Sequence, residues 1–174
     1  MPEFELPPAP RFRVFREVIF RWEHRDKEGN LKGSGEHSID LVPNAGLDWI
    51  SSQVAGTVSG TGTTIALGTG TTTPTMGDLT LAGEITGSGL TRVVGSTSGV
   101  GALVGLASGG DTSQATGSFY VFYTFTASGV VTVNEAGVSI NTTFNAGVVT
   151  HDLLSPAASM AVGDTLLPSF QFIL

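Results

Sequence analysis

The stretch SFYVFYTFTA (residues 118–127), followed by VVTVNEAGVSI (130–140), decides the fold class. The first segment is apolar on both faces and rich in aromatic and β-branched residues, which is typical of a strand buried inside a β-sandwich. The second segment begins after the two-residue break Ser128-Gly129, so the two together predict a central β-hairpin. Gly137, inside the second strand, predicts a β-bulge.

A second hairpin is predicted near the beginning of the sequence. RFRVFREVIFRWEHR (11–25) has the two-residue period of a half-buried strand. The apolar side chains of one parity are Phe12, Val14, Val18, Phe20 and Trp22. The segment DKEGN (26–30) supplies turn residues, and it lacks the glycine position and the bidentate Glu of an EF-hand loop. Residues 35–42 then return as a second, weaker strand.

One short helix is predicted over NAGLDWISSQVAG (44–56). Asn44 is expected as its N-cap and Asp48 lies near its positive end, while Gly56 ends it. The apolar face of this helix consists of Leu47, Ile50 and Val54.

Between residues 57 and 118 there is no aromatic residue, and short apolar runs alternate with Gly, Ser, Thr and Pro. These runs are TIAL (64–67), LTLAGEI (79–85), LTRVV (90–94) and GALVGLA (101–107). Their spacing favours short strands joined by tight loops. The alternative is a disordered, low-complexity middle, in which some loops become ordered only on assembly.

The C-terminal segments complete the strand count. VVTHDLL (148–154), SMAV (159–162) and LLPSFQFIL (166–174) read as strands, with turns predicted at Ser155-Pro156 and Gly163-Asp164. Nine or ten strands and one short helix predict a mainly β fold, a jelly-roll-like or Greek-key β-sandwich. We expect residues 11–174 to form this single domain, preceded by an extended Pro-rich arm over residues 1–10.

Composition and charge narrow the function classes. Only 13% of the residues are charged, so we expect a neutral surface that is largely covered by partners or by other copies of the chain. Seven of the eight basic residues precede residue 34, but acidic residues are interleaved with them, which argues against nucleic-acid binding. The sequence contains no cysteine, and it predicts neither a signal peptide nor a membrane span.

Residues that carry chemistry are scarce. His24, His37 and His151 stand alone in the sequence apart from Asp152, so we expect structural roles for them and predict no catalytic, metal or cofactor site. The GTGTT segments at 60–64 and 68–72 lack the third glycine, the lysine and the helix of phosphate-binding loops and are read as turns. A glycosidase-like carboxylate pair stays open as an alternative. Its candidate members are Glu84, Asp111, Glu135 and Asp164.

Several motifs occur in a recognisable order between about residue 40 and the last residue. LVPNAGLD (41–48) leads into the predicted helix, and IALGTGTTTP (65–74) precedes an L-x-x-E segment that ends at Glu84 and is followed by Arg92. VNEAGV (133–138) and VGDTL (162–166) come later. Because Glu84 and Arg92 flank one Gly-rich turn, we expect them to form an ion pair.

In this order and spacing, the motifs resemble structural proteins of tailed bacteriophages. The resemblance implies a β-sandwich component of the virion without enzymatic activity, assembled in the host cytoplasm. The first interpretation is a capsid-decorating (cement) protein that forms a homo-oligomer, with a trimer favoured, and binds the major capsid protein. The alternatives are a tail or baseplate component that binds tail subunits, and a receptor-binding or carbohydrate-binding module, which is disfavoured because the aromatic residues lie mostly inside strand patterns.

Overall fold

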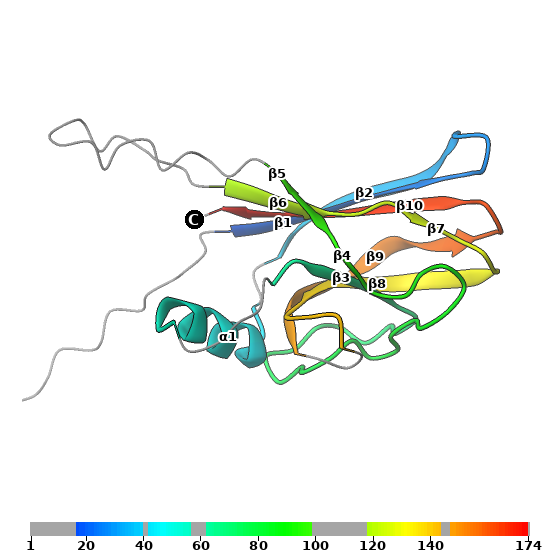
Figure 1. Ribbon diagram of the computed structural model, residues 1–174. Helices are drawn as coiled ribbons and strands as arrows, with labels where there is room; N and C mark the ends of the chain where they lie inside the picture. The colour runs from blue at the N-terminus through cyan, green and yellow to red at the C-terminus, as the bar shows by residue number, and fades with distance from the viewer. Residues whose placement is uncertain (1–16, 40–41, 57–61, 99–117, 144–146, 174) are drawn as a thin grey trace, which may run out of the picture.

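The computed structural model describes residues 17–39, 42–56, 62–98, 118–143 and 147–173, which form two antiparallel β-sheets and one helix (Figure 1). The six-stranded sheet has the order β2-β1-β10-β6-β5, with β7 also paired to β10, and the four-stranded sheet has the order β4-β3-β8-β9. The elements are β1 (Glu17–Arg25), β2 (Leu31–Ile39), α1 (Asn44–Val54), β3 (Thr64–Gly68), β4 (Val93–Val94), β5 (Ser96–Ser98), β6 (Ser118–Phe122), β7 (Phe125–Thr126), β8 (Val131–Ser139), β9 (Val148–Met160) and β10 (Thr165–Ile173). The predicted mainly β sandwich with one short helix is confirmed, and its jelly-roll or Greek-key detail stays a prediction.

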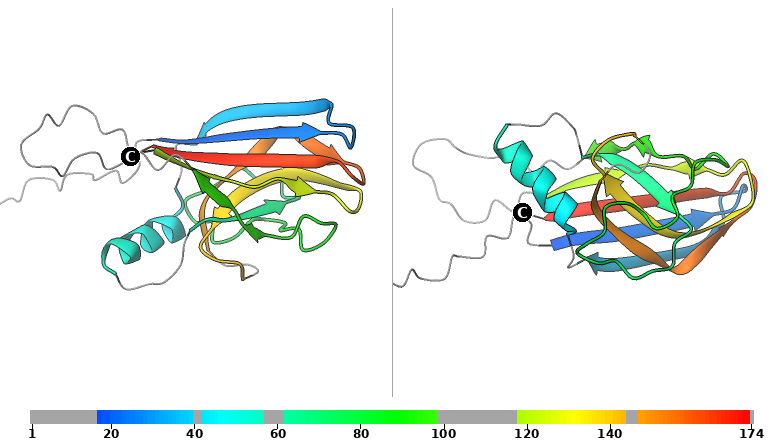
Figure 2. Two further views of the ribbon diagram at one scale, coloured as in Figure 1. Left: turned by 45° about the horizontal axis from the view of Figure 1, so that its top comes forward. Right: turned by 90° about the horizontal axis from the view of Figure 1, so that it is seen from below.

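The core lies between the two sheets (Figure 2). Phe20 on β1 and Phe170 on β10 are direct partners in the six-stranded sheet, and their rings stack with centroids 4.7 Å apart. Phe119 and Phe172 stack in the same way at 4.8 Å. Across from these aromatic side chains, the four-stranded sheet contributes smaller aliphatic ones such as Val138. Burial of these large apolar surfaces is the main driving force that holds the sheets together.

The first predicted hairpin is confirmed, but its second strand, β2, begins at Leu31 and not at residue 35 as predicted. β1 pairs with β2 from Val18 to Arg25, and Val18, Phe20 and Trp22 are buried as the alternation predicts. In the turn, the Asp26 carboxylate accepts hydrogen bonds from the backbone N–H groups of Glu28 (3.0 Å) and Asn30 (2.8 Å). Asp26 thus acts as a turn residue.

The predicted central hairpin between residues 118–127 and 130–140 is wrong. β6 and β7 pair with β10 in one sheet, whereas β8 pairs with β3 and β9 in the other. The link between β7 and β8 passes from the six-stranded sheet to the four-stranded sheet. It lies beside the β9–β10 turn, which also connects the two sheets. Ala127 and Asp164 join the two connections, because the Ala127 N–H donates to the Asp164 carbonyl (2.9 Å). A short link does not by itself force two strands into one sheet.

The segment 118–127 is also less enclosed than predicted. Val121 and Phe125 are buried, but Tyr120 and Phe122 point to the outer face of the six-stranded sheet and are half-buried. The strand is therefore apolar on both faces while only one face lies in the core.

The helix occupies the predicted place, but its details differ. Pro43 is the N-cap residue and no side chain caps the first turn, so the prediction of Asn44 as the cap is wrong. Leu47 is exposed and Ile50 is buried. Gly46 faces the sheet instead, because the helix lies so close to β9 that a Cβ atom there would be 2.3 Å from the Val149 carbonyl oxygen.

Three further local predictions are corrected. LTLAGEI (79–85) forms no strand and makes only an isolated bridge between Glu84 and Gly68. β9 continues through Ser155-Pro156, where a turn was predicted. The register of β8 and β9 shifts between Val133 and Glu135 and between Val138 and Ser139, and not at Gly137.

Other predictions fall on residues that the structure does not describe. The Pro-rich arm (1–10), the beginning of the first predicted strand and the run GALVGLA (101–107) all lie outside the described residues. In the described part of the chain, α1 is too short to span a bilayer, and no other segment is a candidate membrane helix.

Candidate functional site

Most of the polar groups that the structure buries lie on the outer side of the four-stranded sheet. Residues 69–92, which we call the covering segment, run across this side between β3 and β4 (Figure 2, right). Leu81 of the covering segment packs on Ala66 and Val148 and forms a small second apolar cluster with them. Polar side chains surround this cluster, so they require partners from the sheet or from the covering segment.

Glu84 and Arg92 form a buried ion pair, as the sequence predicts. Arg92 Nε and Nη2 donate to the two carboxylate oxygens of Glu84, each at 2.5 Å, and the two side chains are only 2% and 1% exposed. Arg92 Nη1 also donates to Ser139 Oγ (3.0 Å) and to the carbonyl oxygens of Asn141 (2.9 Å) and Thr143. One guanidinium therefore fixes the end of β8, the residues after it and the covering segment together.

Glu135 on β8 is completely buried beneath the covering segment. Its Oε1 accepts hydrogen bonds from the backbone N–H groups of Gly70 (3.2 Å) and Gly83 (3.0 Å). A Cβ atom at Gly68 would lie 2.3 Å from Glu135 Oε1, and one at Gly70 would lie 2.5 Å from it. The glycines of the second GTGTT segment are thus required by a carboxylate that approaches from another strand, and they do not form a phosphate-binding loop.

His151 on β9 lies between two carboxylates. Its Nε2 is 3.0 Å from Asp78 Oδ2, and its Nδ1 faces Glu135 Oε2 at 3.8 Å, which is beyond hydrogen-bond distance. Gly137 makes room for this ring, since a Cβ atom there would be 2.8 Å from His151 Cβ. The imidazole thereby connects the covering segment to β8 and β9.

Asp78 is the carboxylate that reaches solvent. Burial raises its pKa, but hydrogen bonds from the Thr75 backbone N–H and hydroxyl, both 2.7 Å, and from His151 outweigh burial, so the pKa lies below the usual value. Asp78 and His151 line a pocket of about 350 Å³ together with Thr72, Gly77, Leu79, Thr80 and Ala82. Because both nitrogens of His151 face carboxylates, neither is directed at the pocket as a general base would be.

A third network joins the two sheets near the β9–β10 turn. Asp164 Oδ2 accepts hydrogen bonds from the Ala161 backbone N–H (3.0 Å) and Lys32 Nζ (2.6 Å), and it lies 3.0 Å from His24 Nε2. The backbone hydrogen bond, then the Lys32 ammonium and then His24 outweigh burial and hold the pKa of Asp164 well below its usual range. Asp164 therefore fastens the β1–β2 hairpin to the β9–β10 turn.

The carboxylates proposed as a glycosidase-like pair have different partners in the described residues. Glu84, Glu135 and Asp164 each belong to a different network, and Asp111 lies outside the described part. His24 and His151, predicted to stand alone, are paired with carboxylates 140 and 73 residues away in the sequence. Within the ranges that the structure describes, no three suitable side chains are close enough to hold a metal ion.

Replacing Glu135 by Ala is expected to release the covering segment. The variant removes the acceptor of the Gly70 and Gly83 amides, so we expect about 2 kcal/mol lower stability and about tenfold or more faster hydrogen exchange at these two amides. Glu135→Gln is the matched control, since its amide oxygen can accept the same two hydrogen bonds. Equal exchange at both amides in the wild type and Glu135→Ala would contradict this role.

Comparison of the chain with protein-family models, with curated proteins and with solved structures finds no match. The function is therefore inferred from the geometry of the molecule and from the motifs of its sequence.

Proposed function

We propose that this chain is a non-enzymatic structural protein of a tailed-phage virion, and specifically a capsid-decorating protein that binds the outer surface of the shell. The sequence motifs and the β-sandwich support the virion class. The observation that carries the assembly role is a group of exposed apolar side chains at the turn end of the sandwich. The hydrogen-bond networks around Arg92, Glu135 and Asp164 stabilise the fold. A capsid-decorating protein needs surfaces that bind its neighbours, and it needs no catalytic site.

The exposed group comprises Leu31, Val130 and Val162, which we call the tip surface. They are 55%, 82% and 59% exposed. The three residues lie at or next to the β1–β2, β7–β8 and β9–β10 turns, which come together at the end of the sandwich opposite α1 (Figure 1). Exposed apolar side chains that gather at one place on a surface mark a site where another protein docks.

The tip surface is held in a fixed geometry. Gly163 N–H donates to the Ala127 carbonyl (2.8 Å) and Ala127 N–H donates to the Asp164 carbonyl (2.9 Å), so two of the turns are joined directly. Asp164 in turn binds Lys32, the neighbour of Leu31. A rigid apolar surface loses little conformational entropy on docking, which favours binding.

The other end of the sandwich supports a separate attachment. Glu17, the first residue that the structure describes, and Ile173 are direct partners at that end, opposite the tip surface. We propose that the Pro-rich arm (1–10) contacts neighbouring subunits of a trimer or of the shell, where an extended segment can add main-chain hydrogen bonds.

Charges on the tip surface are expected to prevent attachment. The double variant Val130→Glu/Val162→Glu should bind particles that lack the native protein at least tenfold more weakly than the wild type, because docking would bury two unpaired carboxylates. Leu79→Glu is the matched control, since Leu79 is 64% exposed and hydrogen-bonds through its carbonyl to Val148, at the opposite end of β9. Cosedimentation with purified particles measures the affinity, and undiminished attachment of the double variant would contradict the proposed docking surface.

Deletion of residues 1–10 tests the arm. The shortened chain should keep the thermal unfolding transition of the full chain and bind particles more weakly, because the deletion leaves every described strand intact. Unchanged attachment would count against a role of the arm.

A further inference from the structure

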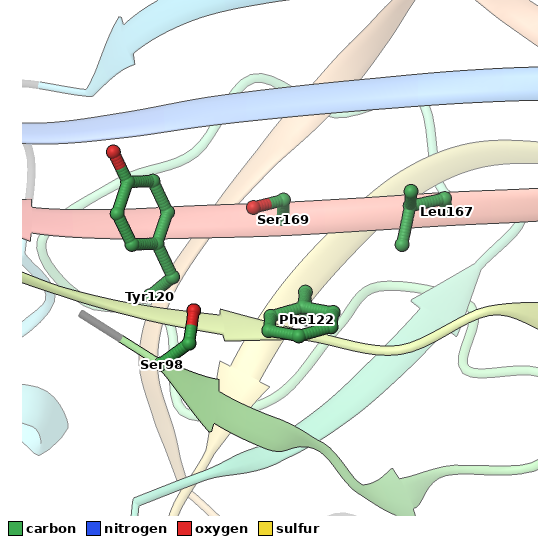
Figure 3. A pocket seen from close by; sticks show the side chains of 5 residues that line it. All are labelled: Ser98, Tyr120, Phe122, Leu167 and Ser169. Atoms are coloured by element: carbon green, nitrogen blue, oxygen red, sulfur yellow. The ribbon is translucent and has the colours of Figure 1, made fainter.

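The outer face of the six-stranded sheet carries a hollow whose lining comes from three neighbouring strands (Figure 3). Tyr120 and Phe122 project from β6, and their direct partners Ser98 on β5 and Ser169 on β10 flank them. Leu167 on β10 closes the lining of this hollow of about 310 Å³. Direct partners in a ladder point to the same face, so all of these side chains face outward.

The aromatic rings in this hollow are not explained by the core. Phe119 and Val121, on the alternate positions of β6, already pack inward, and Phe119 stacks on Phe172. Tyr120 and Phe122 are only half-buried, with their rings on the outer face. Two residues along a strand span roughly 6.5 Å, so each ring can serve as a separate flat surface for a ligand.

Beside the hollow, Arg21 is the direct partner of Ser169 and is paired with Glu36 (2.6 Å). The lining that the structure describes has no charged group itself. It combines aromatic and aliphatic surface with the hydroxyl groups of Ser98, Ser169 and Tyr120. Beside it, Gln171 is the direct partner of Tyr120 and accepts a hydrogen bond from Arg21 Nη1 (2.9 Å), which fixes the amide at the border of the hollow. A charged ligand would find no counter-ion in the lining, and a purely apolar ligand would leave the hydroxyl groups without partners.

We propose that this hollow is a binding site for a neutral carbohydrate of one or two sugar rings. A pyranose has an apolar C–H face that can stack on an aromatic ring and a rim of hydroxyl groups that can hydrogen-bond to serine. The volume lies at the lower end of the ~300–1,000 Å³ range of small-molecule sites, which fits such a ligand and is too small for a helix or a strand. The site is independent of the tip surface, so a decorating protein can be attached to its particle while it holds a glycan.

Binding can be tested with the full chain and neutral disaccharides built from glucose, mannose or galactose at millimolar concentration. We expect saturable changes in the amide NMR signals of β5, β6 and β10 around the hollow. Tyr120→Ala and Phe122→Ala should each weaken binding about tenfold, since each removes one stacking surface. Leu79→Ala, which removes an exposed apolar side chain elsewhere, should bind like the wild type.

A second variant keeps the test valid if an alanine substitution impairs folding. Ser169→Gln places a larger side chain in the hollow without removing a ring, and it should abolish binding while the unfolding transition stays unchanged. The proposal is overturned if no neutral sugar of the panel binds, or if sugars bind equally well to Ser169→Gln. It is also overturned if the wild type self-associates through this face and Phe122→Glu makes it monomeric, because the hollow then belongs to an interface between copies. None of these results affects attachment through the tip surface.

Discussion

Arg92→Met is expected to lower the free energy of unfolding by about 3–5 kcal/mol, the usual cost of breaking a buried ion pair by removing one partner. The substitution keeps the aliphatic stem of the side chain but leaves the Glu84 carboxylate buried without its guanidinium. It also removes the donor to the carbonyl oxygens of Asn141 and Thr143, which lie just after β8. Equilibrium unfolding in urea at neutral pH measures the loss.

Arg25→Met is the matched control for this prediction. Arg25 forms its ion pair with Glu23 at the surface, where both side chains are about half exposed, so we expect a loss below about 1 kcal/mol. The double variant Glu84→Gln/Arg92→Met should lose less than Arg92→Met alone, because it no longer buries an uncompensated charge. A loss below about 1 kcal/mol for Arg92→Met would show that the pair does not anchor the covering segment.

Asp164→Ala is expected to destabilise the protein by about 3 kcal/mol at neutral pH. The variant leaves His24, Lys32 and the Ala161 N–H without their shared acceptor, in a position where Asp164 is almost fully buried. It should also loosen the β9–β10 turn and with it the tip surface.

The contribution of Asp164 should depend on pH in a defined direction. Its pKa is lowered in the folded protein by the Ala161 N–H, then by Lys32 and then by His24, so the stabilisation is fully present above the unfolded pKa of about 4 and is lost as the pH falls below that value. The stability of the wild type should therefore fall more steeply in acid than that of Asp164→Ala. Asp48→Ala, an exposed carboxylate on α1, should follow the wild type. Parallel acid profiles for the wild type and Asp164→Ala would contradict the assignment.

Strands and turns that depend on neighbouring residues could be predicted from the sequence. The alternation of Val18, Phe20 and Trp22 identifies the buried side of β1, and the turn residues before β2 identify the first hairpin. The sheet to which a strand belongs was not predictable in the same way. β6 and β8 follow one another closely, but the link between them changes layer, and no periodicity of side chains encodes that change.

For the polar networks as well, only pairs that are close in the sequence could be predicted. Glu84 and Arg92 are eight residues apart and flank one turn, so their pairing could be predicted. Asp164 and His24 are 140 residues apart and meet only because β1 and β10 are neighbours. Since the pairing of distant strands brings such groups together, the histidines look solitary in the sequence although two of them are paired in the fold.

The motifs that resemble phage structural proteins acquire a physical meaning in the structure. The glycines of the LGTGTT-type loop, Gly68 and Gly70, leave space for Glu135, and Gly137 leaves space for His151. The acidic residue of the GDTL motif is Asp164, which binds Lys32. These motif residues thus hold segments of the chain onto the sandwich.

Since we propose that this chain decorates a phage capsid, the first measurement is cryo-electron microscopy of virions purified from the source of the sequence. We expect density for a two-layer sandwich at lattice positions on the outer shell, with the β1–β2, β7–β8 and β9–β10 turns directed toward the capsid surface. Density only along the tail or at its end would contradict capsid decoration and support the tail alternative. Particles without this sandwich would contradict the virion role itself.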